Sequence, residues 1–132
     1  MKHIIKGYLR NWPRQIFGMS KQDRTKTGVR EILHHPGVYI LYDRRIPYYI
    51  GRTDHTLWGR IYGHARNSST RYFNFWDNFS AFIIEDERDR VRVEGILIAA
   101  MPSANGAQPR LHRISLPGVA MDWLRKHHPT IL

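Results

Sequence analysis

Five side chains in the middle of this chain have the types and the spacing to act on a phosphate ester. Arg60 and His64 stand four residues apart, so on a helix they would share one face. Tyr39 and Tyr49 lie in two short segments that favour adjacent strands of a hairpin, and Glu94 would enter from a later helix. Phosphodiester hydrolysis needs a deprotonated water, neutralised non-bridging oxygens and a stabilised leaving oxygen. A guanidinium, an imidazole, two phenols and a carboxylate could meet those needs at one spot.

Taken singly, each of these residues has an ordinary structural interpretation. Tyrosines on a hairpin usually pack, arginines on a helix usually face solvent, and a glutamate near a helix start usually interacts with the helix dipole. The case for chemistry therefore depends on the order in which the residues occur together.

That order resembles the GIY-YIG nuclease family. Two tripeptides give the family its name, and here they read Gly37-Val38-Tyr39 and Tyr49-Ile50-Gly51, with Val in place of the first Ile. The family then places an arginine on its first helix and a histidine or tyrosine one turn later, where Arg60 and His64 stand. The further matching positions are Leu57, Glu94, Leu97, Ile98, Pro102 and Asn105. The resemblance covers roughly residues 36 to 106.

The resemblance implies a role for each site residue. Arg60 would bind the scissile phosphate, and Tyr39 would act as general base, directly or through water. A free phenol titrates near 10, so the pKa of Tyr39 would have to be depressed by Arg60 and the metal ion, with His64 able to accept its proton. Tyr49 would hold the water or the phosphate, and Asn105 would orient the neighbouring groups.

The resemblance also assigns one divalent cation, Mg²⁺ or Mn²⁺, to Glu94. Mg²⁺ keeps several water ligands and needs few protein carboxylates. The acidic run at 85–87 could form a second cluster, but a solvated charge run at a strand end is the better interpretation. A carboxylate-rich two-metal nuclease would need converging acids and a neighbouring lysine. The sequence places no lysine near Glu94; the lysines are Lys2, Lys6, Lys21, Lys26 and Lys126.

The charge of the chain indicates a polyanionic partner. Lys and Arg number 21 against 11 Asp and Glu, giving a formal net charge of +10. We expect nucleic acid, and DNA because the family usually cuts DNA. The expected contacts are Arg52, Arg60, Arg66 and Arg71 near the site and Lys6, Arg10 and Arg14 in the N-terminal arm. Two alternatives stay open: a non-catalytic nucleic-acid-binding module, and a nuclease acting on RNA.

The surrounding sequence indicates the elements that would position these residues. Segments rich in β-branched and aromatic residues predict a three-stranded antiparallel sheet near 38–42, 47–51 and 79–85. Apolar residues at helical spacing predict flanking helices near 54–66, capped by Thr53 or Asp54, and near 88–101. The expected fold class is α/β (α+β), of the GIY-YIG type.

One domain with two extensions is expected. Residues 1–35 would form a basic, partly helical arm, 36–106 the nuclease core, and 107–132 a C-terminal tail packing on the core. The arm holds apolar residues at helix-like spacing: Ile5, Tyr8, Leu9, Trp12 and Ile16. Gly59 and Gly63, inside the first expected core helix, indicate close approach by nucleic acid or by a packed strand.

The remaining composition limits the class of protein. The chain contains no cysteine, which excludes disulfides, thiolate metal sites and cysteine nucleophiles. Charge interrupts the first apolar residues too early for a signal peptide, and the apolar run at 96–101 is far short of the roughly 20 residues needed to span a bilayer. We expect a cytoplasmic protein that does not enter membranes; the sequence does not indicate an oligomeric state.

Overall fold

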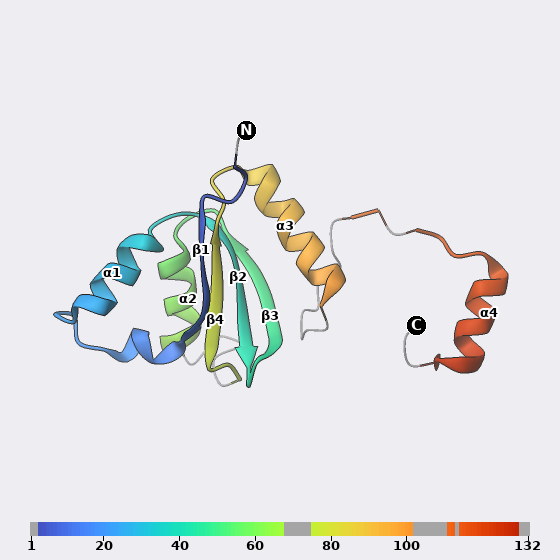
Figure 1. Cartoon of the computed structure of the whole chain (residues 1–132), viewed down its shortest axis with the longest axis horizontal. Helices are drawn as coiled ribbons and strands as arrows, with labels where there is room; N and C mark the ends of the chain where they lie inside the picture. Colours follow the sequence, from blue (N-terminus) through green and yellow to red (C-terminus); the bar gives the residue numbers. More distant parts are fainter. Residues whose placement is uncertain (1–2, 68–74, 102–110, 113, 130–132) are drawn as a thin grey trace.

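The computed structural model describes residues 3–67, 75–101, 111–112 and 114–129, and in them an antiparallel sheet carries helices on both faces (Figure 1). The strand order is β1-β4-β2-β3. The predicted α+β class and the antiparallel sheet are confirmed, but the sheet has four strands rather than three.

The hairpin that carries the two tyrosines forms as predicted. Strand β2 (Gly37–Asp43) pairs with β3 (Ile46–Thr53), and the turn between them holds Arg44 and Arg45 at positive φ. Tyr39 lies opposite Gly51 in this pair. On its other side β2 pairs with β4 (Asn78–Ile83), the predicted third strand, so β3 is left at the edge of the described sheet.

The N-terminal arm is a strand where a short helix or an irregular segment was predicted. Strand β1 (Gly7–Pro13) pairs with the outer side of β4. Its register shifts between Leu9 and Trp12, with Asn11 at positive φ, and both apolar side chains pack on the same core cluster. In a regular strand two residues three apart point to opposite faces, so the bulge is what returns Trp12 to the core side. The same three-residue spacing imitates a helix in the sequence.

Two helical segments lie between the arm and the hairpin. The short helix η1 (Arg14–Gly18) buries Ile16 and Phe17. Helix α1 (Arg24–Ile32) agrees with the partly helical arm that was predicted, and Asp23 caps it by accepting the backbone N–H groups of Thr25 and Lys26 at 2.9 and 3.1 Å.

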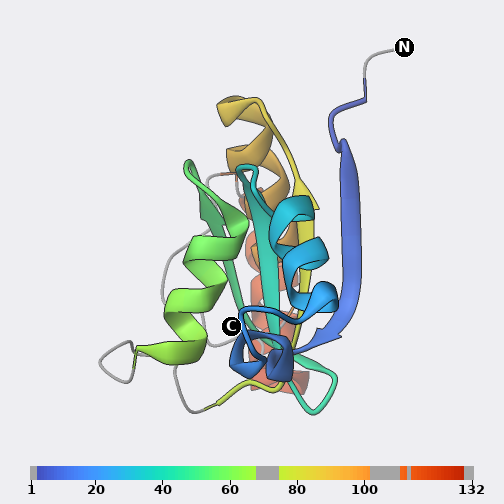
Figure 2. The same ribbon diagram turned by 90° about the vertical axis from the view of Figure 1, so that its left-hand side faces the viewer.

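Each face of the sheet has its own core. Helices α1 and α2 (Leu57–Arg66) lie on one face together with η1, and Figure 2 shows both helices in front of the sheet. Helix α3 (Glu87–Ala100) covers the other face. Helices α2 and α3 match the predictions at 54–66 and 88–101 except at their ends. Thr56 caps α2 in place of Thr53 or Asp54, and its hydroxyl accepts the N–H of Gly59 at 3.1 Å.

The C-terminal tail does not pack on the core in the residues described, contrary to the prediction. Helix α4 (Gly118–His127) lies apart from the sheet (Figure 1), and its Val119 and Trp123 are 83% and 52% exposed. In the described part of the chain, no helix has the length and apolar character to cross a membrane.

Candidate active site

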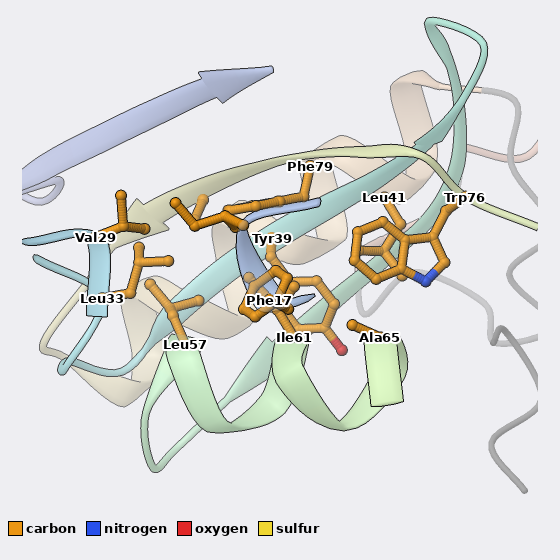
Figure 3. Packing of buried hydrophobic residues seen from close by; sticks show 12 residues of the cluster. Phe17, Val29, Leu33, Tyr39, Leu41, Leu57, Ile61, Ala65, Trp76 and Phe79 are labelled. Carbon is orange, nitrogen blue, oxygen red and sulfur yellow. The ribbon is translucent and has the colours of Figure 1, made fainter. Parts of the chain in front are cut away.

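A hydrogen-bonded group of three side chains lies between strand β2 and helix α2. The Tyr39 hydroxyl is 2.8 Å from His64 Nε2, and Arg60 Nε donates to the same hydroxyl oxygen at 3.4 Å. The direction of the bond between Tyr39 and His64 depends on the imidazole tautomer: Nε2 accepts the hydroxyl proton when Nδ1 carries the ring hydrogen. In Figure 3 the tyrosine ring sits among the core side chains with its oxygen directed toward α2.

Tyr49 joins this group from the neighbouring strand. Its ring centroid is 6.1 Å from that of Tyr39 and 5.6 Å from that of His64. The structure therefore brings together Tyr39, Tyr49, Arg60 and His64, four of the residues predicted for one site. The i, i+4 spacing on α2 and the pairing of β2 with β3 account for this.

Both glycines of the two tripeptides are required by close contacts. A Cβ atom on Gly51 would lie 2.5 Å from the Tyr39 hydroxyl oxygen and 2.9 Å from a ring carbon of Tyr49. A Cβ atom on Gly37 would collide with the carbonyl oxygen of Phe82 in β4. Neither glycine has a positive φ, so each is needed for space rather than for an unusual backbone.

Burial decides the protonation of this group. Tyr39 is fully buried, and this desolvation is the largest cause of a pKa above the ordinary value. The neighbouring Tyr49 raises the pKa of Tyr39 further, whereas the hydrogen bond from Arg60 lowers it. Arg60 therefore lowers the pKa of Tyr39 as predicted, but burial outweighs it, and the net shift in the protein alone is upward. Burial, assisted by Arg60, lowers the pKa of His64 to about 4. At neutral pH the group is a phenol, a neutral imidazole and one guanidinium, whose own pKa is raised by the hydrogen bond with Tyr39.

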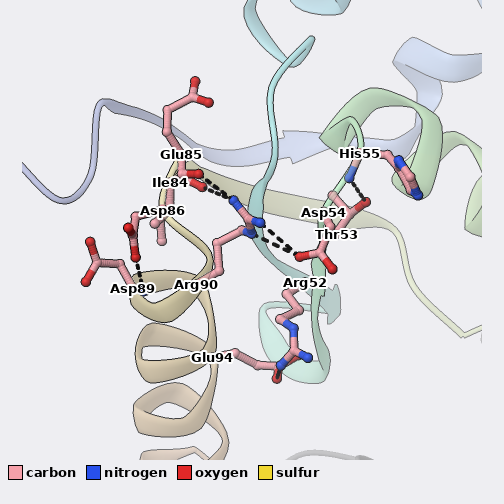
Figure 4. Close-up of polar contacts among 10 residues, drawn as sticks. All are labelled: Arg52, Thr53, Asp54, His55, Ile84, Glu85, Asp86, Asp89, Arg90 and Glu94. Atoms are coloured by element: carbon pink, nitrogen blue, oxygen red, sulfur yellow. Dashed lines mark hydrogen bonds and ion pairs between the residues drawn. The ribbon is translucent and has the colours of Figure 1, made fainter.

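Glu94 reaches the same strand from the opposite face of the sheet. Its carboxylate oxygen Oε1 lies 3.1 Å from Arg52 NH1, with both side chains largely buried (Figure 4). Arg52 follows Gly51 directly in the edge strand β3. Glu94 therefore does not join the Tyr39 group: it contacts Arg52 from the α3 face of the sheet, whereas the Tyr39 group lies at Gly51 on the α2 face.

The donor set suits a hydrated cation held by one carboxylate. The described residues contain no group of three or more His, Asp or Glu side chains arranged to hold a metal. Mg²⁺ retains several waters and binds through one or two carboxylates, so the oxygens of Glu94 meet this requirement. The guanidinium of Arg52 would share that carboxylate with the ion.

The acidic run at 85–87 and its neighbours have structural roles. Asp86 caps α3 by accepting Asp89 N–H at 3.1 Å, and Glu85 lies 2.9 Å from Nδ1 of His35. These contacts agree with the prediction of a charge run rather than a second metal cluster.

Arg90 and Asp54 form a contact that the sequence did not indicate. The buried guanidinium of Arg90 donates to the carbonyls of Ile84 and Glu85 at 3.0 and 2.7 Å and to Asp54 Oδ1 at 3.0 and 3.2 Å (Figure 4). It fixes the start of α3 to the loop before α2. No sequence signal separates this arginine from the others on its helix.

The arginines predicted to bind nucleic acid fall into different classes. Arg14 donates to the carbonyls of Trp76 and Ala65 at 3.1 and 2.9 Å and lies 4.7 Å from the Trp76 ring centroid. Its role is structural, which corrects the prediction for this residue, and Arg52 is paired with Glu94. The exposed members of the predicted set are Lys6, Arg10, Arg60 and Arg66. Asn105 and Arg71 lie outside the described residues.

Comparison with known proteins finds no relative of this chain. No protein-family model, no curated protein and no solved structure matches the chain. The function must be argued from the arrangement of its own residues.

Proposed function

We propose that this protein is a metal-dependent endonuclease of the GIY-YIG type that hydrolyses phosphodiester bonds of nucleic acid, with DNA as its substrate, at a single site. The observation that supports this most directly is the Tyr39 hydroxyl held between His64 Nε2 at 2.8 Å and Arg60 Nε at 3.4 Å. A phenol placed between a proton acceptor and a guanidinium is poised for proton transfer beside a phosphate-binding group.

Arg60 binds the scissile phosphate in this proposal. Its guanidinium hydrogen-bonds both Tyr39 and Tyr49 on an exposed side chain, and its remaining N–H groups would contact the phosphate oxygens. The hydrogen bond from Nε fixes the orientation of the guanidinium, so less side-chain entropy is lost when phosphate binds.

In this proposal the Tyr39 hydroxyl gives up its proton and His64 accepts it. In the tautomer that leaves Nε2 of His64 unprotonated, the hydroxyl proton of Tyr39 points to this nitrogen, and its transfer needs no rearrangement of either ring. With the pKa of His64 at about 4, this transfer is uphill in the free protein. The substrate phosphate is an anion, so the positive charge that favours the phenolate would have to come from Arg60 and a bound cation.

Glu94 is the carboxylate that would hold the cation, and the ion would have to compete for it with Arg52, which pairs with it at 3.1 Å. A bound Mg²⁺ or Mn²⁺ would polarise the phosphate and stabilise the leaving oxygen. Tyr49 packs against both Tyr39 and His64 and holds their rings in their relative positions.

One observation favours a second candidate, a non-catalytic nucleic-acid-binding module. Tyr39 is fully buried, and a hydroxyl that contacts no solvent meets its partners in the same way in a purely structural network. Under this alternative the exposed arginines bind nucleic acid and the buried group only stabilises the fold.

Cleavage of labelled DNA and RNA with and without Mg²⁺ separates the two functions. We expect Mg²⁺-dependent cleavage by the wild type, and its loss in Glu94→Gln with binding nearly unchanged. Glu85→Gln is the matched control, because it makes the same charge change at a carboxylate near the start of the same helix and should keep full activity. If Glu94→Gln kept more than a few per cent of activity, the metal assignment would fail. Binding without cleavage by the wild type would establish the second candidate, and cleavage of RNA alone would replace DNA as the substrate.

A further inference from the structure

A pocket of about 350 Å³ opens between helices α1 and α2, on the sheet face that also carries Arg60 and His64. Its lining residues are Lys21, Lys26, Thr27, Arg30, Trp58, Gly59 and Tyr62. The volume falls in the range of ordinary small-ligand sites. None of the roles described above uses this pocket.

The rim of the pocket is cationic. Lys21 and Arg30 are exposed, and in the described part of the chain neither forms an ion pair. Lys26 donates to the carbonyl of Met19 at 2.8 Å, which fixes its ammonium at the rim. No carboxylate is among the lining residues described, so the pocket favours an anion.

Two aromatic rings form one wall. Trp58 and Tyr62 lie one turn apart on α2, with ring centroids 6.2 Å apart and planes at 30°. Phe17 supports both from the core, at 4.7 Å from Trp58 and 6.1 Å from Tyr62. Tyr62 remains 38% exposed, which leaves ring surface for a planar group to stack on.

We propose that this pocket binds an unpaired nucleotide of the nucleic-acid strand that is cleaved at Arg60. A nucleotide has two groups that this pocket can bind: its anionic phosphate can contact Lys21 and Arg30, and its base can stack on the ring of Tyr62. Bases in a duplex already stack on one another, so only an unpaired base can use this wall.

The position of the pocket relates it to the site, and this step rests on the proposed function. Gly59 lines the pocket and Arg60 is the next residue of the same helix. Adjacent helix residues are separated by about 1.5 Å along the axis and by about 100° around it, so Arg60 lies around α2 from Trp58 and Tyr62. A strand bound at Arg60 would cross α2 beside Gly59 to place a neighbouring nucleotide in the pocket, which predicts a substrate with single-stranded character at the cut.

Binding of two DNA probes in EDTA tests the pocket without cleavage. The probes are fluorescein-labelled dT12 and a blunt hairpin duplex of similar charge. We expect Tyr62→Ala to weaken dT12 binding about tenfold, a typical loss for one stacked base, and to change duplex binding less than twofold. Lys21→Ala/Arg30→Ala should also weaken dT12 binding and flatten its salt slope by about 1.4, since each phosphate contact on a single strand contributes about 0.7.

The double variant Arg88→Ala/Arg92→Ala is the matched control, because it removes the same charge from exposed positions of α3. Equal losses for both probes in the pocket variants, or the same dT12 loss in the control, would overturn the proposal. So would competition by free dTMP as strong as that by unlabelled dT12, since the pocket would then bind a mononucleotide. Thermal melting of each variant excludes unfolding as the cause.

Cleavage measured in parallel with Mg²⁺ keeps this inference separate from the proposed function. If the wild type never cleaves but the pocket variants lose only dT12 binding, the nuclease fails and the nucleotide pocket stands. If the wild type cleaves and the pocket variants bind and cleave dT12 as it does, the pocket fails and the nuclease stands.

Discussion

Gly51→Ala probes the closest packing in the site. The added methyl group would lie 2.5 Å from the Tyr39 hydroxyl oxygen and 2.6 Å from Cζ of the same ring. Carbon atoms in contact prefer about 3.5–4.0 Å, so the tyrosine must move by about 1 Å. Overpacking of this kind costs about 1–3 kcal/mol, and weakening the buried hydrogen bond to His64 adds about 1 kcal/mol or more. We expect the free energy of unfolding to fall by about 3 kcal/mol.

A double-mutant cycle with Tyr39→Phe identifies the cause of that loss. Phenylalanine keeps the Cζ atom but lacks the hydroxyl and its hydrogen bond to His64, so Gly51→Ala should cost about 1 kcal/mol less in the Tyr39→Phe background. Urea denaturation of the four proteins measures the coupling, and Gly28→Ala controls for adding a methyl group, since no atom lies within 4 Å of a Cβ at Gly28. Additive costs, or a Gly51→Ala protein within about 0.5 kcal/mol of the wild type, would refute the steric account.

Three further experiments test other parts of the structure. The pKa of His64 is lowered to about 4, so between about pH 6.5 and 4 the unfolded chain binds a proton that the folded protein does not. The free energy of unfolding should therefore fall by about 1.4 kcal/mol per pH unit as the pH drops through this range. Urea denaturation of His64→Gln should not show this pH dependence. Arg14→Ala should lower the unfolding free energy by about 2 kcal/mol because two carbonyls lose their donor, whereas exposed Arg10→Ala should stay within about 0.5 kcal/mol. Gly63→Ala and Gly28→Ala should each stabilise a helix by up to about 1 kcal/mol, because a Cβ at either position meets no atom within 4 Å. Loss of cleavage in Gly63→Ala alone would show that the substrate crosses α2 at this residue, and equal activity of the two variants would exclude this.

The elements of the central fold could be predicted because their signals are local. The hairpin has two β-rich segments around a polar turn, and α2 and α3 have apolar residues at helical spacing. Tyr39 and Tyr49 come together because antiparallel pairing follows from a short turn, and Arg60 and His64 because four residues make about one helical turn.

The N-terminal strand could not be predicted in this way. Its apolar residues Leu9 and Trp12 lie three apart, and only the bulge between them places both on the core side of a strand. Whether such a segment becomes a helix or an edge strand depends on an open neighbour, here β4, which lies about 70 residues later in the sequence. The exposed apolar face of α4 could not be predicted either, since apolar residues in a tail favour packing by composition alone.

The electrostatics of the site needed the structure because burial has no local signal. From the sequence, Arg60 beside Tyr39 predicts a depressed tyrosine pKa, but desolvation at a fully buried position outweighs the guanidinium. The same limitation applies to the arginines: Arg14 and Arg90 donate to backbone carbonyls, and nothing in their sequence context separates them from arginines that face solvent.

The position of Glu94 decides how the two halves of the site can act together. Its ion pair with Arg52 and the buried Tyr39 group meet at one step of β3, where Gly51 faces α2 and Arg52 faces α3. Because β3 is the edge strand of the described sheet, no further strand lies beyond it between the two sides. A cation on Glu94 would compete with Arg52 for the carboxylate, and the freed guanidinium would lie next to Gly51, where a phosphate bound at Arg60 is also expected. Metal binding and phosphate binding should therefore favour each other, and Arg52→Ala should strengthen the first while weakening the second.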